Sequence, residues 1–115
     1  MDQRLEKALE FSNYMTTLNN QRRLLHEKYL ENTVHYIHGG KFVVTLELIN
    51  FFNFLLQREQ DSVVLVDANN TPIEITDISK FLDDILDIYF TNTNEYFAKY
   101  NEIKTKRNVE DLLDV

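Results

Sequence analysis

The most apolar stretch of the chain is the run FVVTLELINFFNFLL, which spans residues 42–56 near the middle of the sequence. Thr45 has the hydroxyl of a helix N-cap, and Val44 and Ile49 occupy the two positions of a hydrophobic staple around it. Beyond the cap, apolar residues leave only a thin polar edge, which predicts a short helix that is buried on most of its sides. The stretch is too short to span a bilayer, which requires about 20 apolar residues. We expect the rest of the chain, or a partner, to pack against this central helix.

Two long amphipathic helices are expected to flank the central part of the chain. The first covers about residues 2–32 and carries a heptad-like stripe of apolar residues on one face. The last covers about residues 77–107, with a kink or break near Asn92 as the alternative to one continuous helix. The members of the first stripe are Ala8, Phe11, Met15, Leu18, Leu25 and Tyr29. Arg22 interrupts this stripe, and a cation at a buried position is expected to need a carboxylate partner.

The segment between the long helices is predicted to contain one or two β-hairpins besides the central helix. The clearer hairpin pairs residues 62–67 with residues 71–75 across an Ala-Asn-Asn turn, because Asn tolerates the left-handed conformation that such turns require. The other would place Gly39 and Gly40 in a two-residue turn between the β-prone runs TVHYI and KFVV. The alternative continues the first helix to His38 and ends it at a left-handed Gly39.

These elements predict an α+β protein, mostly α-helical, with two long antiparallel helices, a central buried short helix and one or two β-hairpins. The 115 residues are expected to form a single domain. Within it, residues 33–76 carry the hairpins and the central helix, and residues 108–115 form a short acidic tail. A hydrophobic content of 43% is sufficient for a core, even at a net charge of -7.

The composition argues against several classes of function. The net charge of -7 disfavours a general affinity for nucleic acid or anionic membranes, because binding to either depends on cationic side chains. Without cysteine, the chain has no disulfide, no thiolate nucleophile and no cysteine-ligated zinc. The sequence MDQRLEKALEF at the start is charged and helical, unlike a signal peptide. We therefore expect a cytoplasmic protein, found in the host cytoplasm or in the virion if the protein is viral.

No arrangement of side chains in the sequence predicts a catalytic, cofactor or metal site. The three histidines, His26, His35 and His38, lack the spacing of zinc ligands and are expected at the surface or in a turn. Aspartates within residues 83–87 are expected to lie opposite the apolar stripe of the last helix. There they would be solvated, and their pKa values would not be tuned for acid–base chemistry. We therefore expect a protein that is not an enzyme and that needs no cofactor.

The sequence instead predicts a protein that binds other proteins. The tail VEDLLDV leaves two alternatives: its leucines fold back onto the protein's own helices, or they anchor an acidic peptide in another protein's groove. In the second alternative, the partner-binding residues of the tail are Asp111, Leu112, Leu113 and Val115. Phe51 and Phe54 of the central helix are further partner-binding candidates, if their rings are exposed. The apolar stripe of the first helix and the central helix together predict self-association, most simply as a two-fold dimer.

Two segments carry a resemblance to known proteins. One is the run GGKF at residues 39–42 with the helix start that follows it, and the other is TPIEI at residues 71–75, followed by an acidic helix. Together they resemble small uncharacterised proteins encoded by contractile-tailed bacteriophages, particularly those of marine cyanobacteria. The resemblance implies a phage origin and no specific activity. The order long helix, hairpin, long helix also resembles prefoldin subunits, although the inserted central helix departs from that plan.

The expected role is therefore that of a phage-encoded assembly factor, a minor structural component or an adaptor. The alternative is an accessory regulator that binds the transcription or replication machinery of the host or phage.

Overall fold

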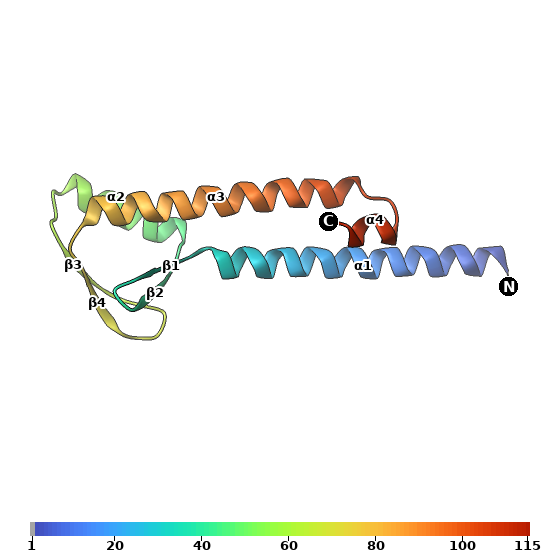
Figure 1. Cartoon of the computed structure of the whole chain (residues 1–115), viewed down its shortest axis with the longest axis horizontal. Coiled ribbons are helices and arrows are strands. Elements are labelled where there is room, and N and C mark those ends of the chain that lie inside the picture. The colour runs from blue at the N-terminus through green and yellow to red at the C-terminus, as the bar shows by residue number, and fades with distance from the viewer. Residues whose placement is uncertain (1) are drawn as a thin grey trace. The chain divides into compact units, whose positions relative to one another are not determined.

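The computed structural model describes residues 2–115, and its elements follow the predicted order (Figure 1). Helix α1 spans Gln3–Asn32 and helix α3 spans Ile78–Thr105, with the hairpins and helix α2, Leu46–Gln57, between them in sequence. A last short helix, α4, covers Val109–Leu113. The prediction of a mostly helical α+β protein is confirmed.

Contacts between residues divide the chain into two compact units. The terminal unit comprises the chain up to Tyr29 together with Asn94–Val115, and the central unit comprises Leu30–Thr93. Each unit has its own cluster of buried side chains, a larger one in the central unit and a smaller one in the terminal unit. That the two units behave as one cooperative domain, as the sequence predicts, stays a prediction.

The helices begin at the capping residues that the sequence contains. At the start of α1, Oδ1 of Asp2 accepts a hydrogen bond from a backbone N–H two residues on, at 2.9 Å. Asp77 caps α3 by accepting from the N–H of Lys80 at 3.0 Å. Thr45 caps α2 by accepting from the N–H of Leu48 at 3.1 Å, as predicted.

Helix α3 is one continuous helix, as the sequence predicts, so the alternative of a break near Asn92 is wrong. The side chain of Asn92 donates a hydrogen bond to the carbonyl of Ile88, one turn earlier in the same helix, at 2.8 Å. Its amide also donates to the carbonyl of Asn32 at 3.2 Å. Asn92 therefore joins α3 to the last residue of α1 within the central unit.

Both predicted hairpins are present, as two separate two-stranded antiparallel sheets. The first pairs β1, Val34–Ile37, with β2, Gly40–Val43, which decides against a helix that continues to the glycines. The second pairs β3, Val63–Val66, with β4, Pro72–Ile75. Asn70 in the turn of the second hairpin has a φ of 61°, the left-handed conformation expected of an asparagine there.

The turn of the first hairpin lies one residue earlier than predicted. Its central residues are His38 and Gly39, with φ values of 51° and 78°, and positive φ at both central residues is what a type I′ hairpin turn requires. Gly40 instead begins β2, where a Cβ would come within 2.9 Å of Cγ1 of Ile73. The second glycine therefore serves the close approach of the two hairpins, not the turn.

The core of the central unit is organised around Phe81 of α3. Its ring stacks on the ring of Phe52 of α2, with 4.1 Å between centroids. The rings of Phe42 in β2 and His35 in β1 meet it nearly edge-on, at 5.6 Å and 5.2 Å. Three other elements thus contact a single buried side chain of α3.

Helix α2 is buried on one face only, which corrects the expectation that most of its sides are covered. Phe52 and Leu55 are buried, whereas Leu46, Phe51 and Phe54 are exposed. A unit of this size has too few elements to surround a helix, because small domains bury a smaller fraction of their surface. The outer face of α2 is therefore apolar and accessible.

Replacing Phe52 by alanine is expected to lower the free energy of unfolding by about 3–5 kcal/mol, because the lost ring leaves a cavity beside Phe81. Phe54→Ala is the matched control on the exposed face of the same helix, with an expected change below about 1 kcal/mol. Urea denaturation followed by circular dichroism measures both values. Equal losses in the two variants would contradict the one-sided burial of α2.

Candidate functional site

The histidines and carboxylates do not gather into a metal site: among residues 2–115, no three of them come together as metal ligands would. His38 lies in the turn of the first hairpin, as expected. His35 is not a surface residue, because its side chain is largely covered. Its Nε2 is 3.8 Å from Oδ2 of Asp84, too far for a hydrogen bond, and Nζ of Lys80 is 3.2 Å from the same oxygen.

His35 is best understood as a packed, uncharged residue. Burial lowers its pKa below the ordinary value of 6.5, and Lys80 lowers it further, whereas Asp84 raises it less than burial lowers it. The imidazole is therefore neutral at neutral pH and packs its edge on Phe81. The His35 side chain therefore packs in the core of the central unit.

Asp67 has a role that the sequence analysis did not anticipate. Its carboxylate accepts hydrogen bonds from the backbone N–H groups of Lys41, Asn69 and Thr71, each at 2.9 Å. The N–H of Ala68 donates to the carbonyl of Lys41 at 2.8 Å. One acidic side chain therefore fixes the turn of the second hairpin and joins it to β2 of the first.

The hydrogen bond from Lys41, followed by those from Thr71 and Asn69, lowers the pKa of Asp67 below its ordinary value of 3.8. An aspartate directly before an Ala-Asn-Asn turn is a signal that the sequence contains, since Asp side chains bind backbone N–H groups two residues on. The bond to Lys41, which is 26 residues away, has no local signal.

The C-terminal tail folds back within the terminal unit. Asn108 caps α4 by accepting a hydrogen bond from the N–H of Asp111 at 2.8 Å. Leu112 is 0% exposed and packs with Leu18 and Ile103. The alternative in which the leucines fold back onto the protein's own helices therefore holds for Leu112.

Of the tail residues predicted to bind a partner, only Leu113 is a large apolar side chain that remains mostly exposed, at 64%. Leu112 is a core residue, so its assignment to a partner-binding surface is corrected. Val115 packs against the same cluster, and Asp111 accepts a 2.9 Å hydrogen bond from the side chain of Asn108. Docking of the tail through Leu113 stays a prediction.

Arg22 meets an aromatic ring where the sequence analysis expected a carboxylate. Its guanidinium carbon is 5.6 Å from the centroid of Tyr100, and Nζ of Lys104 is 5.8 Å from the same centroid. Both distances allow a cation–π interaction. The interruption of the apolar stripe of α1 is therefore compatible with packing against α3 in the terminal unit.

The outer face of α2 is the first surface suited to a protein partner. It presents both aromatic candidates from the sequence, Phe51 and Phe54, and the guanidinium of Arg58 lies 5.6 Å from the Phe54 centroid. A groove of about 420 Å³ lies beside the first turn of α2, and its lining includes the exposed side chains Val43 and Val66.

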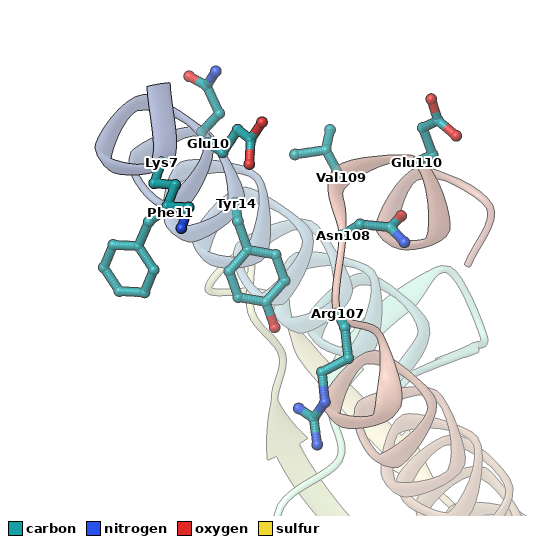
Figure 2. A pocket seen from close by; sticks show the side chains of 9 residues that line it. Lys7, Glu10, Phe11, Tyr14, Arg107, Asn108, Val109 and Glu110 are labelled. Atoms are coloured by element: carbon teal, nitrogen blue, oxygen red, sulfur yellow. The ribbon is translucent and has the colours of Figure 1, made fainter. Parts of the chain in front are cut away.

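A second surface lies in the terminal unit, between α1 and the start of α4. This groove has a volume of about 790 Å³. Figure 2 shows Lys7, Phe11 and Tyr14 on the α1 side and Arg107 and Val109 on the other. No signal in the sequence predicted this groove, because Phe11 is only one member of the apolar stripe of α1 in the sequence.

Comparison of the chain with protein-family models, curated proteins and solved structures finds no match. The resemblance to phage proteins and to prefoldin subunits therefore stays a prediction. Among the helices of the described residues, none combines the length and the apolar character needed to cross a membrane.

Because the pKa of Asp67 is lower in the folded protein than in the unfolded chain, the unfolded chain binds more protons under acidic conditions. The stabilisation of the folded protein by the ionised Asp67 carboxylate is complete above the ordinary pKa of 3.8. It is lost as the pH falls through the lower pKa of this group in the folded protein. Asp67→Asn should have a lower Tm at pH 7 and a flatter decline of Tm below about pH 5.

Thermal unfolding between pH 7 and pH 2 measures this dependence, with the exposed carboxylate variant Glu74→Gln as the control. An acid transition that is unchanged in Asp67→Asn would contradict the role of this carboxylate.

Leu112 and Leu113 offer adjacent positions that differ only in burial. Leu112→Ala is expected to lower the free energy of unfolding of the terminal unit by about 2–5 kcal/mol, because it opens a cavity against Leu18 and Ile103. Leu113→Ala should change it by about 0.5 kcal/mol or less. Hydrogen exchange of the α1 and α4 amides measures the two effects. Similar protection in both variants would show that the tail does not contribute to the core.

Proposed function

We propose that the protein is a non-enzymatic protein–protein interaction protein whose partner binds the outer face of α2. The observation that carries this proposal is the exposure of Phe51 and Phe54 on a helix that is firmly capped and packed on its other face. A rigid helix with exposed aromatic rings binds at a small entropic cost, because few torsions have to be ordered. Buried aromatic anchors commonly dominate the energy of such interfaces.

The chemistry around α2 favours an apolar partner segment. Leu46 is exposed at the start of the helix, and the neighbouring groove adds Val43 and Val66. Glu47 in the first turn of α2 and Arg58 directly after its last residue carry one charge of each sign, so a partner with balanced polar groups around an apolar centre would fit. Such a partner would supply an amphipathic helix or a short apolar strand.

The biological role within this proposal rests on the sequence resemblance. It is that of a phage-encoded assembly factor, minor structural component or adaptor, acting in the host cytoplasm or in the virion. Its partner is then another protein of the particle or of its assembly pathway.

The test compares the tagged protein with two serine variants in affinity purification from infected cyanobacterial cells. Phe54→Ser should abolish or strongly reduce recovery of the partner, because it removes an interface anchor without disturbing the core. Phe90→Ser is the matched control, since the two rings are 52% and 56% exposed in the same unit. Both variants should keep the wild-type Tm.

Equal recovery of a partner by Phe54→Ser and the wild type would reject α2 as the binding surface. Recovery of polymerase or replication subunits that depends on Phe54 would instead favour the regulator over the structural role.

A further inference from the structure

The first three turns of α1 extend past the end of α3 within the terminal unit. The two helices run antiparallel: Leu18 packs with Ile103, and further toward the start of α1 the hydroxyl of Tyr14 donates to the carbonyl of Lys106 at 2.9 Å. Helix α3 ends at Thr105, so residues 3–13 of α1 have no α3 segment beside them (Figure 1). We call residues 3–13 the overhang.

The overhang is uncovered because the chain reverses direction at Asn108. In an antiparallel pair, residues later in the sequence of α3 lie beside residues earlier in the sequence of α1. A helix that continued past Arg107 would therefore have run beside the overhang. Instead Asn108 caps α4, and the side chain of Gln21 donates to the carbonyl of Leu112 at 2.7 Å, which holds α4 further along α1. The path that a longer α3 would have taken is left open.

The open path is the groove of about 790 Å³ in the terminal unit. Phe11 belongs to the same apolar stripe as Leu18 and Leu25, yet it is 67% exposed. In Figure 2 its ring points away from Asn108 and Val109. The stripe of α1 therefore continues into the groove with no residue of the described chain to cover it.

We propose that the overhang of a second copy of this chain fills the groove, in a two-fold symmetric dimer. In such a dimer the two overhangs lie antiparallel, and each supplies the helix that the other lacks beyond the end of α3. The lengths agree: the open path runs beside the overhang of one copy, and the overhang of the other copy fills it. Each overhang is about 16 Å long at 1.5 Å per residue. The antiparallel direction also carries the rest of each copy away from the other.

Charge favours a second copy over a strongly charged partner. In the antiparallel arrangement, the start of one overhang, with Asp2 and Glu6, approaches the inner end of the other groove, where Arg107 lies. None of these three side chains forms an ion pair with another described residue. The groove also contains Lys7 and Glu10, so it has both signs, although the chain has a net charge of -7. It is a surface on which two acidic copies can meet with little repulsion.

The interface uses a surface other than the outer face of α2, so it goes beyond the proposed function and does not rest on it. Two short helical segments bury less area than a standard interface, so we expect a dissociation constant in the micromolar range. The full-length chain should accordingly move from monomer to dimer over about 1–200 µM.

Sedimentation equilibrium over that range tests the proposal on the wild type and on two serine variants. Phe11→Ser should raise the dimer Kd by at least about 30-fold, because it removes an exposed aromatic ring that lines the groove. Phe97→Ser is the matched control, with a ring that is 68% exposed in the same unit, and should dimerise like the wild type. A wild type that stays at 13.7 kDa, or a Phe11→Ser variant that associates like the wild type, overturns the proposal.

A second measurement uses the absence of cysteine from the sequence. Lys7 lines the groove near the middle of the overhang, close to where the two-fold axis would pass, so Lys7→Cys should form a disulfide-linked dimer under mild oxidation. Leu9→Cys is the control, since Leu9 does not line the groove and its side chain is rotated by about 200° around the helix from that of Lys7. Crosslinking of Leu9→Cys as fast as Lys7→Cys, or of neither, overturns the arrangement even if Phe11→Ser fails to fold.

Discussion

The ring of Phe81 is the contact on which the central unit depends. Phe52 of α2, Phe42 of β2 and His35 of β1 all meet this one ring. Two-stranded hairpins are only marginally stable on their own in water, so each needs a helix to cover its apolar face. Phe81 lets one turn of α3 supply that cover to β1, β2 and α2 together.

Polar groups fix the position of one hairpin against the other, which the aromatic core does not determine. Hydrophobic packing is non-directional and does not by itself set how one hairpin meets another. The carboxylate of Asp67 does so, because it can accept several hydrogen bonds at once and takes them from both hairpins. Gly40 complements this bond, since its missing Cβ admits Ile73 to close contact. The arrangement of two sheets that share no strand hydrogen bonds therefore follows from one acid and one glycine.

Much of this fold could be predicted from local sequence, because caps and periodic apolar residues act over a few positions. Thr45 was predicted as a cap, and the ends of α1 and α3 were predicted to within two residues. What could not be predicted depends on contacts that are distant in sequence. The exposure of Phe54 reflects how few elements surround α2, and that of Phe11 reflects where the chain reverses.

The candidate surfaces illustrate the same limit. Phe51 and Phe54 could be proposed from sequence, because a helix that is apolar all round must either be enclosed or present one face to a partner. The sequence could not predict which of Leu112 and Leu113 is buried, since each is flanked by an aspartate and by the other leucine. Only the position of α4 against Leu18 distinguishes them.

The order of the two units along the chain has a consequence for the folding pathway. The central unit is one continuous segment, whereas the terminal unit combines both ends of the chain. Two of its hydrogen bonds, Tyr14 to Lys106 and Gln21 to Leu112, join residues that are separated in sequence by 92 and 91 positions. Closing a loop of that length in an unfolded chain has a large entropic penalty, and non-local contacts form slowly. Once the central unit has formed, α1 and α3 start from residues already held together, and the effective loop is short. We therefore expect the segment 30–93 to form first and the pairing of the chain ends to follow it.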